Sequence, residues 1–143
     1  MVVARSFSAL ALLLLATGCE PAPEPTTFES VGGVCLVSNP DGTVRATVTF
    51  PTCLSSSCDT PTVAVCSVKE ESGGLQVASL GRVEHESGAC TDDCGSLVAH
   101  CDSKAPVAPG TYTVRYGSQT SSVTLPTTGT VVFETDNGFG ACP

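Results

Sequence analysis

The sequence predicts an all-β fold: a disulfide-rich, antiparallel β-sandwich of about seven or eight short strands. Several short segments alternate apolar and polar residues, the pattern of half-buried strands, and no segment has convincing helical spacing. Turn residues separate these segments about every eight to twelve positions. The chain also has nine cysteines and no tryptophan, so we expect crosslinks to stabilise a core that is poor in aromatic rings.

The first expected pair of strands is a hairpin. Residues 34–37 are a short apolar segment, and residues 39–42 have the composition of a turn. Residues 43–50 then alternate, and four apolar side chains fall on one face: Val44, Ala46, Val48 and Phe50. This alternation predicts a half-buried strand that pairs with the first.

The middle of the chain predicts three further strands. Residues 62–69 are apolar on both faces, so we expect this strand to be buried on both sides. After a polar turn, residues 75–80 form another apolar strand, which Gly81 is expected to end. Residues 82–86 alternate charged residues with Val83 and His85 and predict a separate short strand.

The C-terminal part begins with an ambiguous segment and ends with clear strands. Residues 97–99 fit either a short strand or a helical turn. Three apolar segments separated by turn residues then predict strands at 111–116, 120–125 and 130–134.

One stretch of this region carries a resemblance to known domains. The run Ala108-Pro109-Gly110-Thr111-Tyr112-Thr113-Val114-Arg115-Tyr116, followed by Val123-Thr124-Leu125, resembles the final hairpin of immunoglobulin-like and carboxypeptidase-regulatory-like β-sandwiches. It implies an immunoglobulin-like sandwich. Gly110 and Tyr112 fit the G-x-Y of a tyrosine corner, whereas Val114 stands where antibody domains have a cysteine. The resemblance therefore concerns the fold and not an activity.

The N-terminus carries a second resemblance. Arg5 precedes an apolar segment at residues 7–16, which is too short for a bilayer span of about 20 residues. The run Leu12-Leu13-Leu14-Leu15-Ala16-Thr17-Gly18-Cys19 resembles the lipobox of bacterial lipoproteins. This resemblance implies a signal peptide over residues 1–18 and a mature chain that begins at an acylated Cys19. Ordinary signal-peptide cleavage after Gly18 is the alternative.

Cysteine parity favours lipid attachment. An odd number of cysteines leaves one thiol without a partner in an oxidising compartment. Acylation of Cys19 with palmitate-type chains removes it from the count and leaves eight disulfide candidates: Cys35, Cys53, Cys58, Cys66, Cys90, Cys94, Cys101 and Cys142. Eight cysteines can pair in 105 ways, and the sequence does not select among them.

The mature chain divides into a tether and one domain. Residues 19–31 contain three prolines among small and acidic residues, which predicts a flexible, extended tether. Residues 32–143 form the single domain. Loss of Arg5 changes the net charge from −8 to −9, which disfavours nucleic acid as a partner because phosphates require a basic surface.

No residue is assigned to catalysis, to a metal or to a cofactor. The densest cluster of reactive side chains could hold zinc: His85, Cys90, Asp92, Asp93, Cys94, His100 and Cys101. We expect its cysteines to be disulfide-bonded instead, because exported thiols are oxidised. The chain has no G-x-S-x-G nucleophile elbow and no C-x-x-C redox pair. The acidic pairs at 70–71 and 92–93 lack the ligand spacing of a calcium loop.

We therefore expect a membrane-anchored envelope lipoprotein, a non-enzymatic structural or protein-binding module. Glu20 follows Cys19 in place of the aspartate that often retains lipoproteins at the inner membrane, which by analogy favours the bacterial outer membrane, facing the periplasm or the cell surface. The alternative is a small inhibitor or ligand-binding domain that uses the loop 53–58 or the region 90–101. A hydrolase is the third hypothesis.

Overall fold

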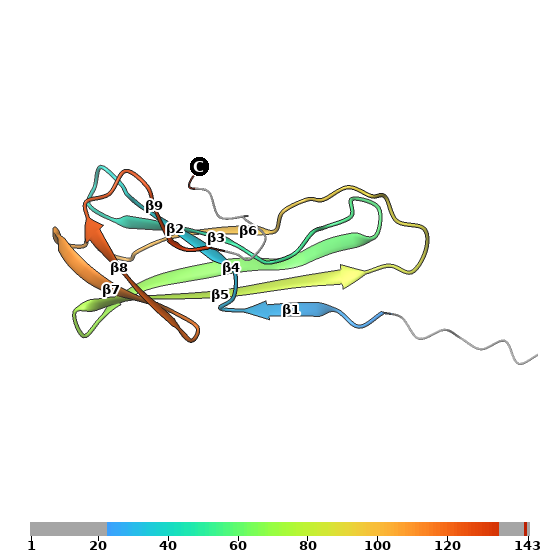
Figure 1. The fold of residues 1–143 in the computed structure, drawn as a ribbon, viewed down its shortest axis with the longest axis horizontal. Coiled ribbons are helices and arrows are strands. Elements are labelled where there is room, and N and C mark those ends of the chain that lie inside the picture. Colours follow the sequence, from blue (N-terminus) through green and yellow to red (C-terminus); the bar gives the residue numbers. More distant parts are fainter. Residues whose placement is uncertain (1–22, 135–141, 143) are drawn as a thin grey trace, which may run out of the picture.

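The computed structural model describes residues 23–134 and Cys142. The predicted signal peptide 1–18, Cys19 and the first residues of the tether lie outside this range. Nine strands and no helix form in the described part of the chain, and they make two sheets (Figure 1). Accordingly, the described residues include no helix long and apolar enough to cross a membrane.

The first sheet is organised around the long strand β5 (Gly74–His85). β4 (Asp59–Glu71) pairs with β5 along its whole length. On the other edge of β5, β7 (Gly110–Tyr116) pairs with residues 74–77, and β1 (Thr26–Glu29) pairs with residues 80–83. β8 (Gln119–Leu125) lies beyond β7. The β5–β7 pair is parallel, so the expectation of a wholly antiparallel fold is wrong at this one pair.

The second sheet is wholly antiparallel and has the order β6 (Val98–Asp102), β3 (Val44–Thr49), β2 (Gly33–Ser38) and β9 (Thr130–Phe133). β2 and β3 form the predicted hairpin, with Gly33 opposite Thr49 and Ser38 opposite Val44. β6 also settles the ambiguous segment near residue 98 as a strand.

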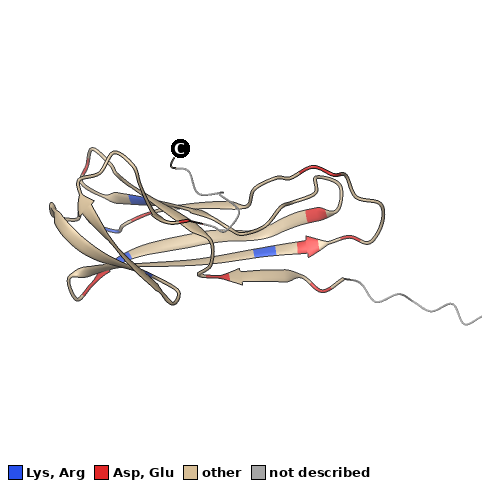
Figure 2. Ribbon diagram, in the orientation of Figure 1, with Lys and Arg blue, Asp and Glu red and all other residues tan. Residues whose placement is uncertain are grey.

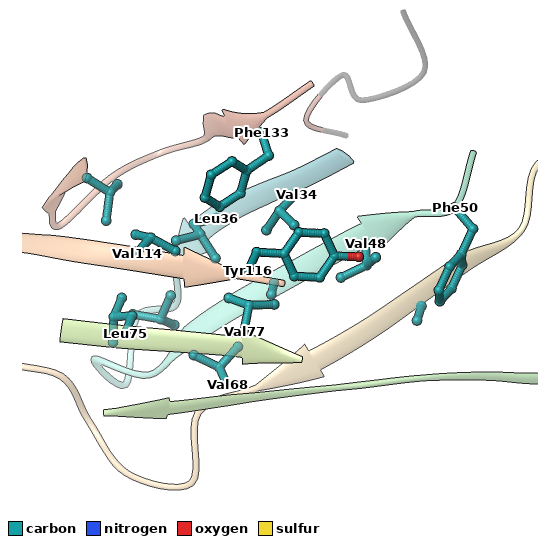
Figure 3. Close-up of a cluster of buried hydrophobic side chains, with 14 of the residues drawn as sticks. Val34, Leu36, Val48, Phe50, Val68, Leu75, Val77, Val114, Tyr116 and Phe133 are labelled. Atoms are coloured by element: carbon teal, nitrogen blue, oxygen red, sulfur yellow. The ribbon is translucent and has the colours of Figure 1, made fainter. Parts of the chain in front are cut away.

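The core lies between the two sheets and draws side chains from both (Figure 3). Tyr116 of β7 is the largest of the fully buried residues and stacks on Phe133 of β9, with ring centroids 5.9 Å apart. Its hydroxyl donates to the carbonyl of Val31 (2.7 Å) and pairs with Ser79 Oγ (2.8 Å). Burial raises the pKa of Tyr116. The Tyr116 hydroxyl is thus hydrogen-bonded to two partners, which avoids the cost of a buried unpaired hydroxyl.

Gly81 does not end a strand. β5 runs through it and unites the segments that were predicted as two separate strands. Gly81 is buried, and a Cβ atom there would lie 2.9 Å from a ring carbon of Phe50 and 3.0 Å from a methyl carbon of Leu97. The glycine is therefore explained by the close approach of these side chains from across the core.

β4 is an edge strand, and the expectation that it is buried on both sides is wrong. Val68 is its one buried residue, and Val65 is 54% exposed. Apolar residues on both faces are equally compatible with a central strand and with an edge strand whose outer face meets solvent. β4 is an edge strand because β5 is the one strand of the described chain with which it pairs.

The predicted tether 19–31 contains a strand, so this boundary is corrected. Residues 26–29 form β1, and the Phe28 ring lies 6.1 Å from that of Phe50. Ser30 N–H donates to the carbonyl of Ser79 (2.9 Å) and Ser79 N–H donates to Ser30 Oγ (3.3 Å). The ordered domain thus begins before residue 32.

Candidate functional site

Two of the four disulfides join loops at one end of the molecule. Cys53–Cys94 and Cys58–Cys90 link the loop after β3 to the loop after β5. Leu54 and Gly95 exchange two backbone hydrogen bonds of 2.9 and 2.8 Å. We call residues 53–58 and 86–95 the tip, and the two sheets with their core the body (Figure 1). The loop 53–58 and the start of the region 90–101, predicted as alternative binding regions, are therefore parts of one surface.

Hydroxyl groups and one carboxylate complete the tip. Asp93 accepts hydrogen bonds from the Thr91 hydroxyl and from the backbone N–H of Ser56 (3.1 Å), which lower its pKa to about 2. Thr91 N–H donates to Ser57 Oγ (2.8 Å), and the Ser55 hydroxyl donates to the carbonyl of Thr91 (3.0 Å). The two loops are thus joined by side-chain hydrogen bonds as well as by sulfur.

Charge is distributed unevenly along the molecule (Figure 2). The tip and the adjoining end of β5 expose four carboxylates: Glu84, Glu86, Asp92 and Asp93. Arg82 is the basic residue of the described chain closest to them along β5. Lys69 and Arg115 both lie opposite Gln76, near the other end of β5, and Lys104 lines a hollow together with Lys69. Arg45 pairs with Asp102, two residues before Lys104. The tip is therefore the acidic end of the molecule.

A second polar constellation joins the tip to the body. His85, the last residue of β5, pairs through Nδ1 with Asp59 Oδ1 on β4 at 2.6 Å. Its Nε2 lies 2.7 Å from Thr26 Oγ1 on β1. The other oxygen of Asp59 accepts the backbone N–H of Ser55 (2.7 Å). The pKa of Asp59 is lowered, first by this N–H and then by His85.

This arrangement has the order hydroxyl, imidazole, carboxylate that hydrolases use to activate a nucleophile. With His85 Nδ1–H donating to Asp59, the Nε2 atom of a neutral ring can accept the Thr26 proton. The Thr26–His85–Asp59 arrangement lies on the open surface, however. Three of the hollows in the described surface, of about 110, 350 and 330 Å³, are lined by other side chains. The same bonds also have a structural effect, because they fasten β1 and β4 to the end of β5.

The structure separates the residues of the alternative zinc site. Cys90, Cys94 and Cys101 are each half of a disulfide, the last with Cys66. His100 lies on the second sheet, where its Nδ1 is 3.1 Å from Thr47 Oγ1. Among residues 23–134 and Cys142, no three metal-type side chains are grouped where they could hold an ion.

The remaining two disulfides belong to the body. Cys66–Cys101 joins β4 to β6 and therefore links the two sheets. Cys35–Cys142 attaches the C-terminal part of the chain to β2. All eight cysteines that were predicted to pair are thus accounted for, whereas Cys19 lies outside the described residues.

Sequence reasoning missed the polar residues that complete the tip and its junction with the body. Thr26, Asp59 and Thr91 were not singled out, because their partners lie 26 to 59 residues away along the chain. The run Ser55-Ser56-Ser57 between two cysteines was the available signal, since such residues hydrogen-bond loops. Comparison of the chain with models of protein families, with curated proteins and with solved structures finds no match.

Proposed function

We propose that this protein is an exported, lipid-anchored module of the bacterial cell envelope that binds another protein through the tip. The observation that carries the binding role is the double clamp: two exposed loops are fixed by two disulfides and a shared hydrogen-bond network. Loops positioned by a rigid scaffold commonly carry binding residues. Four disulfides are compatible with an oxidising location outside the cytoplasm.

The clamp favours binding because it lowers the entropic cost of association. An exposed loop normally loses conformational freedom when a partner orders it, and prior rigidity reduces that loss. The tip presents hydroxyl and carboxylate oxygens, so its partner would be recognised by N–H and O–H donors. An inhibitor or a ligand-binding domain would use the same surface. Identification of the molecule bound at the tip distinguishes these roles from that of an envelope protein-binding module.

Site-specific photo-crosslinking in the native envelope tests this proposal. A photo-reactive residue at Asp92, in the tip, is compared with one at Glu70, an exposed carboxylate at the far end of β4. We expect one discrete crosslinked protein from position 92 and none from position 70. Equal patterns from both positions would remove the tip from the proposal.

The anchor has its own test. We expect the mature N-terminus to have the mass of an acylated Cys19 and the protein to enter the detergent phase of Triton X-114. A Cys19→Ala chain is expected to stay in the aqueous phase. An unmodified Cys19 in protein from its native host would contradict the anchor.

We further propose that the two sheets form an immunoglobulin-like sandwich. The supporting observation is local: the Tyr112 hydroxyl donates to the carbonyl of Ala108 (2.8 Å), as the tyrosine of a tyrosine corner bonds to backbone a few residues upstream. Tyr112→Phe keeps the buried ring and removes this bond, so we expect a loss of about 1 kcal/mol in unfolding free energy.

A hydrolase is the second candidate, and the Thr26–His85–Asp59 arrangement favours it. Its test is labelling by a fluorophosphonate and turnover of a small activated ester. If the arrangement is catalytic, His85→Ala abolishes both and the matched His100→Ala change leaves both intact. An unlabelled wild-type chain assigns these bonds to structure alone.

A further inference from the structure

The first ordered strand enters the fold at the tip. β1 is antiparallel to β5, with Thr26 opposite Val83 and Glu29 opposite Leu80. The beginning of β1 therefore lies beside the end of β5, where the chain continues into the tip (Figure 1). The bond between Thr26 and His85 fixes this end of β1 within two residues of the second tip loop.

β1 is also held firmly along its length. Its Phe28 ring packs near Phe50, and the next residue but one, Ser30, exchanges hydrogen bonds with Ser79. The carbonyl of Val31 then accepts the buried Tyr116 hydroxyl. The chain that precedes Thr26 is therefore attached to the domain at its tip end.

The proposed anchor is a short distance from this entry point. Thr26 follows Cys19 by seven residues, so their Cα atoms are at most about 25 Å apart at ~3.6 Å per residue. Prolines at positions 21, 23 and 25 restrict the backbone between them and favour an extended course.

The opposite end of the molecule lies much farther from that point. Gly74, at the start of β5, is nine residues from Val83, which corresponds to about 30 Å at ~3.4 Å per residue of strand. The turn between β4 and β5 lies beyond Gly74.

We infer that the anchored protein stands with its acidic tip toward the membrane and its β4–β5 turn away from it, and that the tip's partner is a protein at the membrane surface. This inference rests on the proposed anchor. Because a tether of at most about 25 Å holds the tip near the membrane, a protein bound to the tip would lie at the membrane surface as well. The β4–β5 end is then the part presented to the surrounding compartment.

The absence of tryptophan from the chain allows a direct test. Asp92→Trp places a single fluorescent donor in the tip, and Glu70→Trp places one near the β4–β5 turn. Each change removes one exposed carboxylate that makes no side-chain hydrogen bond in the structure. The purified, acylated variants are reconstituted in vesicles whose lipid headgroups carry a dansyl acceptor.

We expect energy transfer from position 92 to exceed transfer from position 70 several-fold. Because both probes have the same affinity for a membrane interface, the difference reports the placement of the two ends. Equal transfer, or stronger transfer from position 70, would overturn the orientation. Flotation of the vesicles with the wild-type chain monitors the anchor separately: a chain that does not float overturns the anchor, and the orientation with it, whereas a floating chain with reversed transfer overturns the orientation alone.

Discussion

The body and the tip are ordered by different forces. In the body, side chains from both sheets fill a core in which Leu36, Val77, Val114 and Tyr116 are at most 1% exposed. In the tip, Leu54 and Cys58 are the buried residues, and every residue from 86 to 95 is exposed. The tip has almost no apolar burial to offset the entropy lost on ordering. In the tip, disulfides and hydrogen bonds offset this loss of entropy instead. The stability of the two regions should therefore respond to different perturbations.

The bridges differ between the two regions as well. Cys66–Cys101 connects opposite sheets, and both of its residues pack against the core. The tip bridges are nested, with residues 58 and 90 inside the segment closed by 53 and 94. Once the inner bridge has formed, the outer one closes a further loop of only about ten residues. Each tip bridge is therefore partly redundant with the other.

The largest expected effect comes from opening the core of the body. Leu36→Ala should lower the unfolding free energy by about 2–5 kcal/mol, because Leu36 is fully buried and its removal leaves a cavity. Denaturant unfolding measures this loss. Val131→Ala, at a residue that is 37% exposed on the neighbouring strand β9, is the control and should change little. Similar losses for the two variants would contradict the assignment of the body's stability to its buried core.

Removal of one disulfide from each region sharpens the comparison. The Cys66→Ala, Cys101→Ala pair should lose about 2–4 kcal/mol of unfolding free energy. The Cys53→Ala, Cys94→Ala pair should lose less, because Cys58–Cys90 still clamps the loops. The segments enclosed are of similar length, with separations of 35 and 41 residues.

Thermal unfolding of the two double variants measures the difference. Proteolysis should separate them further, since the tip variant is expected to be cut in its loops while the body remains folded. If the tip variant loses as much global stability as the body variant, the two regions unfold as one unit.

Acid should release the tip before the body. The Asp93 carboxylate has a folded-state pKa of about 2, below its ordinary value of 3.8. Its stabilising hydrogen bonds are thus fully present above pH 4 and are lost as the pH falls toward 2. The protection of the Ser56 backbone N–H against hydrogen exchange, relative to the intrinsic rate at each pH, should therefore fall over this interval.

Asp93→Asn supplies the matched control for this prediction. The variant should exchange faster at Ser56 already at neutral pH and should lose most of the acid dependence there. Amides of the β2–β3 hairpin should keep the same protection in both chains. A tip that stays protected at pH 2 in the wild-type chain would exclude Asp93 as its acid-labile element.

The smallest expected effect concerns a surface ion pair of the body. Arg45 contacts both carboxylate oxygens of Asp102, at 3.0 and 3.2 Å, and the two side chains are 51% and 43% exposed. Exposed pairs of this kind contribute little because water and salt screen them. Arg45→Ala should leave the unfolding midpoint within experimental error. A clear loss would show that polar contacts carry stability in the body as they do in the tip.

Local sequence patterns predicted the strands but not all of their relations. Alternation placed the β2–β3 hairpin and the strands β7, β8 and β9 close to their observed positions. Gly81 was misread, because a glycine that avoids a clash with Phe50 looks the same in sequence as a glycine that ends a strand. β1 was missed, because its partner in β5 lies more than 50 residues later and proline-rich chain precedes it.

In the candidate site, too, local features were predictable from sequence and long-range contacts were not. The cysteines and serines of the loop 53–58 identified it from sequence as a constrained loop. Its attachment to the loop around Asp93 depends on which cysteines form disulfides, and the sequence does not determine that pairing. The bond between His85 and Asp59 depends on the register of β4 against β5, which is set by the fold as a whole.

The Cys35–Cys142 bridge has a consequence for biogenesis. The two cysteines are separated by 107 residues. Because the chain is synthesised from its N-terminus, Cys35 is made long before its partner Cys142. Six other cysteines of the native bridges appear in the interval, and each is a wrong choice for Cys35. Native pairing of Cys35 therefore requires either that its oxidation is delayed or that early mispaired disulfides are later exchanged.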